Sequence, residues 1–130
     1  MTANRNVSEL LETLKTTLNG LARTRLLMKL LLEEGHDQHE DIVFELGLIG
    51  APEAVPEIVK AANTPFQALV LWGNVQEFQR KCAYALARIG TDEARVALQE
   101  MANSSDADLR EYGQEGLQHW PMPYRQSGRG

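Results

Sequence analysis

Apolar residues recur along most of this chain at the spacing of one face of an α-helix. Near the N-terminus, Val7, Leu10, Leu14 and Leu18 lie three or four residues apart, so a helix would place them on one side. The alternation of apolar and polar residues that is typical of strands is nearly absent. The pattern therefore predicts an all-α protein, with helices over residues 7–18, 21–34, 39–49, 52–62, 75–89, 92–102 and 106–119.

Glycines stand at the predicted helix ends. Gly50 and Gly90 each follow a predicted helix, and a glycine adopts the left-handed conformation of a helix C-terminus without steric cost. Gly20 and Gly35 are expected to end the first two helices, and Gly73 ends an apolar stretch.

The chain contains an internal repeat. Residues 45–62 align with residues 85–102 at an offset of 40, and leucine, isoleucine, glycine and alanine positions coincide. A weaker third copy over residues 108–117 follows its counterpart at an offset of 31. About nine extra residues therefore separate the first two copies, near residues 64–73. A repeat of this length predicts a solenoid of helical pairs.

The best-defined copy, QRKCAYALARIGTDEARVAL over residues 79–98, resembles the HEAT-like repeats of the phycobilisome-lyase (PBS lyase) type. The resemblance covers about residues 38–117. It implies a right-handed α-solenoid of HEAT-like helical hairpins, with about three pairs and a final helix. Such repeats serve as protein-binding scaffolds in many settings, so the resemblance implies an interaction protein.

We expect the whole chain to form one HEAT-like repeat domain, because 130 residues of which 43% are hydrophobic suffice for a single core. Its predicted parts are an N-terminal capping helix pair (1–35), a repeat (38–62), an apolar insertion (63–74), a second repeat (75–103), a last helix (106–119) and a tail (120–130).

In HEAT-like families the second helix of each pair tends to line the concave face, where partners bind. By this resemblance, the predicted partner-binding residues of the concave face are Glu53, Glu57, Lys60, Arg95, Gln99 and Glu100.

The apolar insertion is a second candidate for partner binding. Phe66, Leu69 and Trp72 would act as anchors, because aromatic and apolar anchors dominate the energetics of many interfaces. The alternative is that the insertion folds back as a short helix over the core between the repeats.

The tail carries Trp120, Met122 and Tyr124 with prolines between them. An open solenoid end exposes apolar surface and needs a cap. We expect the tail to supply that cap by packing on the last helix, and the alternative is a tail that binds a partner.

The charge balance restricts the class of partner. Thirteen basic against eighteen acidic residues give a net charge of −5, which argues against a nucleic-acid or anionic-membrane ligand. Residues 31–62 hold eight acidic residues and one basic residue, so we expect a protein partner with a basic surface. No apolar run reaches the roughly 20 residues of a membrane span, and no signal-peptide core follows the N-terminus. We therefore expect a cytoplasmic protein.

Few residues suggest metal binding or catalysis. Cys82, the single cysteine, lies on an apolar helix face and is expected to be a buried structural thiol. His36 and His39 are three residues apart and could share a metal, but metal sites need three or four ligands. A solvated acidic loop is the alternative that we favour. We predict no metal, no cofactor and no catalytic residue.

The pair His39-Glu40 also resembles the His-Glu pairs that hold the di-iron centre of deoxyhypusine hydroxylase. That family needs several such pairs. The later copies carry Gln79-Arg80 and Arg110-Glu111 at the equivalent positions, so one pair cannot build the centre in a monomer. We expect Arg80 and Arg110 to pair instead with Glu77, Asp106 or Asp108.

Taken together, the sequence predicts a non-catalytic scaffold that acts as an adaptor or inhibitor. A bacterial immunity protein that covers a toxin's active site is one form of it, suggested by size and charge. The alternative is an enzyme or enzyme subunit of a HEAT-like family, either a chromophore lyase subunit or a metal-dependent oxygenase.

Overall fold

The computed structural model describes residues 2–122, and all regular structure in this range is helical. Eight α-helices and one short 3₁₀ turn account for it, without any strand, which confirms the all-α prediction for this part of the chain. The elements are α1 (Thr2–Thr16), α2 (Gly20–Leu31), α3 (His39–Ile49), η1 (Pro52–Ala54), α4 (Val55–Ala62), α5 (Gln67–Trp72), α6 (Val75–Ile89), α7 (Asp92–Ala102) and α8 (Ala107–His119).

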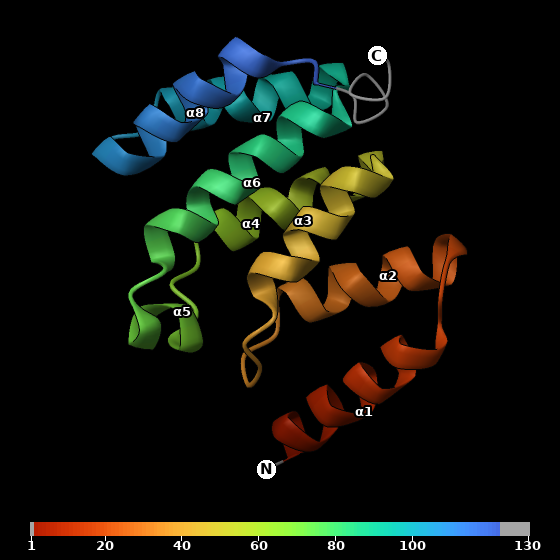
Figure 1. Cartoon of the computed structure of the whole chain (residues 1–130). Helices are drawn as coiled ribbons and strands as arrows, with labels where there is room; N and C mark the ends of the chain where they lie inside the picture. The colour runs from red at the N-terminus through yellow and green to blue at the C-terminus, as the bar shows by residue number, and fades with distance from the viewer. Residues whose placement is uncertain (1, 123–130) are drawn as a thin grey trace.

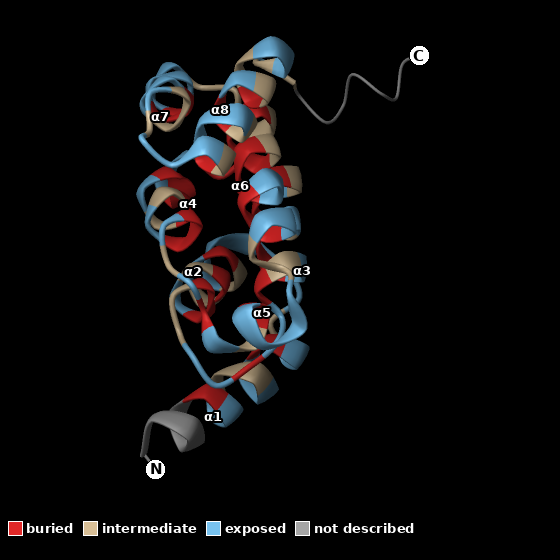
Figure 2. Ribbon diagram, turned by 90° about the vertical axis from the view of Figure 1, so that its left-hand side faces the viewer, coloured by how far each residue is buried: buried red, intermediate tan, exposed pale blue. Residues whose placement is uncertain are grey.

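Apart from α5, which lies back at the level of α2 and the start of α3, the helices stack in chain order, with α1 at one end of the molecule and α8 at the other (Figure 1). Two layers are visible from the side: α2, α4 and α7 form one, and α3, α6 and α8 form the other (Figure 2). Buried residues of the two layers face each other, and the core between them includes Leu46, Ile58, Leu86 and Leu98. Burying these side chains is the main favourable term in the stability of the stack.

Several helix ends lie where the sequence predicts them. Gly50 and Gly90 adopt left-handed φ values of +72° and +73° and close α3 and α6. The hydroxyl of Thr91 accepts a hydrogen bond from the Ala94 backbone at the start of α7. The carboxylate of Asp106 accepts two backbone N–H groups at the start of α8.

Two predicted helix ends were wrong. α1 ends at Thr16, and Gly20 has a positive φ of +80° but is the first residue of α2 rather than the cap of α1. α2 ends at Leu31 instead of continuing to Glu34. Beyond Leu31 the backbone forms a turn, in which the Leu32 and Glu33 N–H groups donate to the Lys29 and Leu30 oxygens.

Glycines allow the closest helix crossings. A Cβ atom added to Gly47 of α3 would lie 3.0 Å from the Ala85 Cα of α6. On α8, a Cβ added to Gly113 would lie 2.4 Å from the backbone nitrogen of Ala102. These glycines are therefore required by packing and not by backbone conformation.

Arg23 connects the first three helices. Its guanidinium donates to the backbone oxygens of Leu14 (3.0 Å) and Thr17 (2.8 Å), where α1 ends. The same group forms a two-point ion pair with the Glu45 carboxylate of α3, at 2.5 and 2.9 Å. Because Arg23 is only 20% exposed, these charge-assisted hydrogen bonds are partly shielded from water.

We expect Arg23→Ala to lower the free energy of unfolding by about 2 kcal/mol, since carbonyls and a carboxylate lose a charged donor. Arg25→Ala is the matched control: Arg25 is exposed, and its replacement should change stability by less than about 0.5 kcal/mol. Urea unfolding followed by circular dichroism measures both values. Equal, small effects of the two variants would show that Arg23 does not hold the first helices together.

The tail covers a different surface from the one predicted. Trp120 donates from its indole nitrogen to the Thr91 oxygen at 3.0 Å, and the Met122 backbone donates to the Ala87 oxygen at 2.8 Å. The guanidinium of Arg95 lies 5.1 Å from the centre of the Trp120 ring. The tail therefore packs on the turn between α6 and α7 instead of on the last helix. Tyr124 lies outside the described residues.

The predicted partners of the two helix-start arginines were also wrong. Arg80 on α6 pairs with Glu115 on α8 at 2.8 Å, because these two helices pack side by side. Arg110 donates to the Ser104 backbone oxygen at 3.0 Å, within the loop that precedes its own helix.

Candidate docking surface

The apolar insertion folds as the short helix α5, and its inner side belongs to the core. Phe66 is 1% exposed and Leu69 is 6% exposed. The Phe66 ring stacks on His39 with centroids 4.0 Å apart and meets Phe78 edge-on. The alternative prediction, that the insertion folds back as a short helix over the core, thus describes this side of α5. Phe66 and Leu69 are accordingly removed from the set of candidate anchors, because a partner cannot reach them.

The outer side of α5 is exposed and apolar. Val70, Leu71 and Trp72 are 55%, 78% and 72% exposed, and they follow one another in the chain. We refer to these three residues as the α5 patch. Contiguous exposed apolar side chains of this size are typical of a surface that binds another molecule.

Both ends of α5 are fixed by hydrogen bonds. The Glu34 carboxylate accepts the Gln67 backbone N–H at 2.9 Å, which satisfies a free donor at the helix start. At the other end, the Asn74 backbone donates to the Leu69 oxygen at 2.8 Å. The α5 patch is therefore held in a defined position, so less conformational entropy is lost when a partner binds.

A hollow of about 760 Å³ lies beside the α5 patch. Leu11 of α1 forms one wall, and Ala68, Val70 and Leu71 of α5 form another. Residues 34–38 of the loop between α2 and α3 complete the lining. Glu34 and Asp37 in this loop are exposed, so the hollow is apolar within and acidic at its edge.

Stacked histidine rings lie under the loop between α2 and α3, on the side of the core. The His36 and His39 rings are stacked with centroids 4.1 Å apart. The Nε2 atom of His36 lies 2.7 Å from the Leu30 oxygen, and Nε2 of His39 lies 2.7 Å from the Glu33 oxygen. The His36 ring thus donates to a carbonyl in the last turn of α2, and the His39 ring donates to a carbonyl of the loop that follows α2.

Burial lowers the pKa of His39 from its ordinary value to about 4, and the neighbouring His36 adds to the effect. Hydrogen bonding to Glu33 and the charges of Glu34 and Asp37 act in the opposite direction but are smaller. His39 is therefore neutral at pH 7, with Nε2 protonated and Nδ1 without a partner among the described residues.

The remaining candidate groups for chemistry are enclosed in the core. Cys82 is completely buried, and burial raises the pKa of its thiol far above the ordinary range. In the part of the chain that the structure describes, no three His, Cys, Asp or Glu side chains gather as metal ligands would. His39, the residue on which the oxygenase alternative depends, is sealed between two rings.

Residues 78–104, which form most of α6 and all of α7, match the family described as PBS lyase HEAT-like repeat. This segment is therefore a HEAT-like repeat of that type. No curated protein and no solved structure is significantly similar to the chain. None of the described helices is long and apolar enough to cross a membrane.

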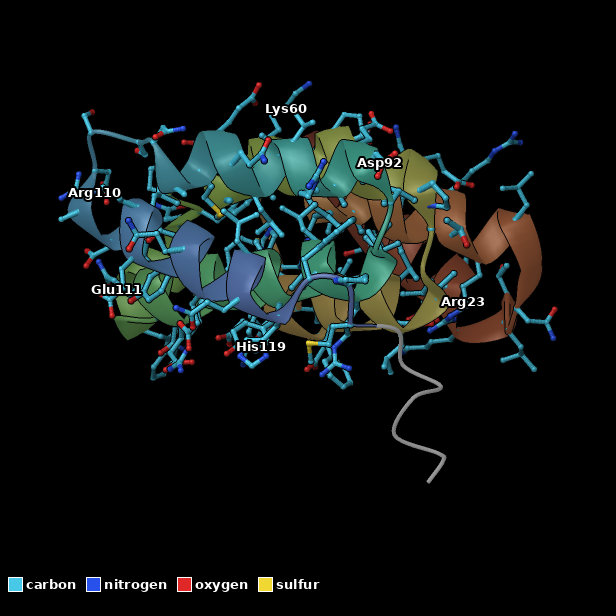
Figure 3. All side chains as sticks on the ribbon, turned by 90° about the horizontal axis from the view of Figure 1, so that it is seen from above. Arg23, Lys60, Asp92, Arg110, Glu111 and His119 are labelled. Carbon is cyan, nitrogen blue, oxygen red and sulfur yellow. The ribbon has the colours of Figure 1, made fainter. Side chains whose placement is uncertain are left out.

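The polar residues predicted for the concave face lie on η1, α4 and α7. Five are exposed and Glu57 is half-buried. Lys60 projects from the layer of α2, α4 and α7, and His119 projects from the opposite side of the molecule (Figure 3). Glu100 lines a smaller hollow of about 220 Å³ between α4 and α7. The residues of this set are Glu53, Glu57, Lys60, Arg95, Gln99 and Glu100.

Sequence reasoning missed part of the exposed apolar surface. Val70 and Leu71 belong to the α5 patch but were not selected as anchors. The i, i+3 spacing of Phe66 and Leu69 was the available signal, because it assigns those two residues to the inner face of a helix. Phe44, 51% exposed on α3, was missed as well.

Proposed function

We propose that this HEAT-like repeat protein is a non-catalytic scaffold that binds another protein through the α5 patch and the hollow beside it. The observation that carries the proposal is the exposure of Leu71, which lines a hollow with an acidic rim and is followed in the chain by the similarly exposed Trp72. HEAT-like repeats generally serve as scaffolds for protein interaction, and this surface gives such a scaffold a specific contact point.

The chemistry of the surface defines the partner. An apolar side chain of the partner would enter the hollow, where Leu11 and Leu71 form apolar walls. Basic side chains around it would meet Glu34 and Asp37, so charge complementarity would set the orientation of the complex. The partner is thus a protein with an apolar anchor in a basic surface.

The finer features of the proposal concern the whole stack. We further propose that the stack is a right-handed solenoid of about three helical pairs and a final helix. The alternation of helices between the two layers supports the arrangement in pairs. The α4 and α7 residues named above would then form a second contact region on the concave face. An immunity protein that covers a basic toxin is one form of this scaffold, supported by its size and its net charge of −5.

The double variant Leu71→Ser, Trp72→Ala should abolish partner binding, because it removes the two most exposed side chains of the α5 patch. The tagged protein is first used to capture partners from its native lysate, and mass spectrometry identifies them. The purified partner is then titrated by calorimetry, where we expect the dissociation constant to rise about a hundredfold. Affinity for the wild type should fall as salt is added.

The matched control is Leu18→Ser, Leu21→Ser, which removes two exposed apolar residues elsewhere, 75% and 51% exposed. It should bind the partner as the wild type does. Equal binding by both double variants would refute the α5 patch as the docking site.

A further inference from the structure

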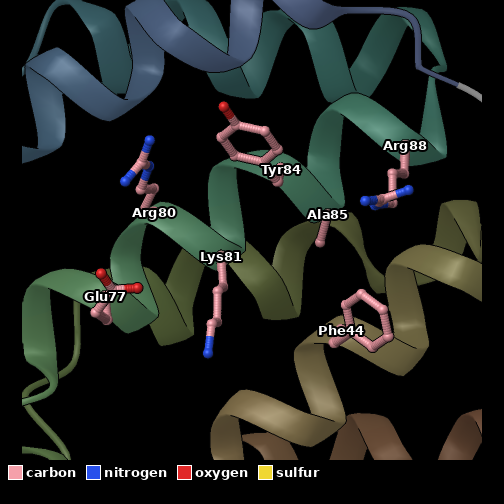
Figure 4. A pocket seen from close by; sticks show the side chains of 7 residues that line it. All are labelled: Phe44, Glu77, Arg80, Lys81, Tyr84, Ala85 and Arg88. Carbon is pink, nitrogen blue, oxygen red and sulfur yellow. The ribbon is translucent and has the colours of Figure 1, made fainter.

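A second hollow, of about 390 Å³, lies on the other layer between α3 and α6. Figure 4 shows it from close by: Arg88 and Phe44 stand at one end, and Glu77 stands at the other. Arg88 lies eleven positions after Glu77 on α6, so the groove runs for about 16 Å along this helix. It shares no lining residue with the hollow beside α5.

Arg88 is held in place but its donors are free. Its side chain passes over Gly47, where a Cβ would lie 3.5 Å from the Arg88 Cδ. Its guanidinium lies 5.9 Å from the centre of the Phe44 ring. Among the described residues, no carboxylate pairs with Arg88 and no acceptor receives a hydrogen bond from it.

The other two bases of the groove are already neutralised. Arg80 pairs with Glu115 at 2.8 Å, and Lys81 pairs with Glu40 at 3.3 Å. Arg88 is therefore the cation that this groove offers to a ligand, and its fork of N–H groups fits a carboxylate in two-point geometry.

The wall next to Arg88 is apolar. Phe44 is 51% exposed and lines the hollow from α3. The Tyr84 ring and the Ala85 side chain line the same hollow from α6. The tyrosine hydroxyl donates to Glu115 of α8 at 2.9 Å, which restrains the ring.

We propose that the groove between α3 and α6 binds a short acidic segment of a partner protein. One apolar side chain of the segment packs between Phe44 and Tyr84, and a neighbouring carboxylate pairs with Arg88. This site is separate from the α5 patch. It binds an acidic segment, whereas the surface around the α5 patch favours a basic partner. A nucleic acid fits less well, because the groove offers one free guanidinium in a protein of net charge −5, and the carboxylate of Glu77 stands at its other end.

A library of short random peptides displayed on phage tests this proposal without knowledge of the partner. The immobilised wild-type protein is the target, and the variant Arg88→Glu removes binders of other surfaces in a counter-selection. We expect the enriched peptides to combine Asp or Glu with an adjacent large apolar residue. A synthetic peptide of the enriched sequence should bind Arg88→Glu at least about tenfold more weakly.

Three further variants make the result specific. Phe44→Ala should also weaken the peptide, since it removes the apolar wall. Arg25→Glu reverses an exposed charge elsewhere and should leave affinity unchanged. Leu71→Ser, Trp72→Ala should leave it unchanged too, so failure here is distinguishable from failure of the proposed function. Thermal melts of each variant confirm that it is folded.

The proposal would be overturned by enriched peptides without acidic residues, or by the absence of any enrichment over the counter-selected variant. Peptides whose binding depends on Trp72 instead of Arg88 would assign them to the α5 patch. A single-stranded oligonucleotide that binds the groove and displaces the peptide at lower concentration would show a nucleic-acid site instead.

Discussion

Replacing Gly113 by alanine is expected to lower the free energy of unfolding by about 3 kcal/mol and the melting temperature by about 10 °C. The added Cβ would lie 2.4 Å from the Ala102 nitrogen and 2.7 Å from the Met101 carbonyl carbon. These are backbone atoms of α7, so they cannot move aside as the end of a flexible side chain would. The helix α8 would have to shift away from α7, and the packing of both helices would loosen.

The sign of this effect makes the test informative. An alanine in an ordinary helix interior stabilises the protein by up to about 1 kcal/mol relative to glycine. Gln114→Ala, at the exposed neighbouring position, is the control and should change stability by less than about 0.5 kcal/mol. Thermal unfolding followed by circular dichroism measures both variants. A stabilised Gly113→Ala would mean that α7 and α8 do not approach each other as closely as described.

Lowering the pH from 7 to 4 should cost the wild type about 3 kcal/mol more stability than it costs His39→Phe. The pKa of His39 is about 4 in the folded protein and about 6.5 in the unfolded chain. As the pH falls, His39 is therefore protonated in the unfolded chain at a higher pH than in the folded protein. The contribution of neutral, buried His39 to the free energy of unfolding is complete above pH 6.5 and is lost as the pH falls towards 4.

The variant His39→Phe keeps a ring between His36 and Phe66 but has no group to protonate. It loses the hydrogen bond to Glu33, so it should be less stable at pH 7 and should depend less on pH. Urea titrations at several pH values between 4 and 7 measure the difference in slope. Parallel pH profiles of wild type and variant would contradict the burial of a neutral His39.

The sequence predicts the elements of the stack well where the relevant forces are local. The bounds of α3 and α6 follow from apolar periodicity and from the glycines that end them, Gly50 and Gly90. Such signals depend only on neighbours within a few residues, so they can be interpreted without knowledge of the fold.

The candidate sites depend on contacts between distant residues, and there the sequence fails. The segment that contains His36 and His39 has the sequence of a polar, solvated loop. His39 is nevertheless buried, because Phe66, distant in sequence, stacks on its ring. Arg80 meets Glu115 through the packing of α6 on α8, which no spacing within one helix reveals. Exposure of Phe44 likewise depends on what the neighbouring helices leave uncovered.

In the layered arrangement, some helices pack against many neighbouring helices and others against few. Helix α6 packs against α3, α4, α5, α7 and α8, whereas α1 packs mainly on α2. Opening α6 would therefore disrupt most of the core, but α1 can separate while the rest stays folded, as terminal units of stacked proteins do. Leu11 of α1 forms one wall of the hollow beside α5, so that hollow has one firm side and one that can yield. We therefore expect that a small displacement of α1 would change the width of this hollow and leave the remainder of the stack in place.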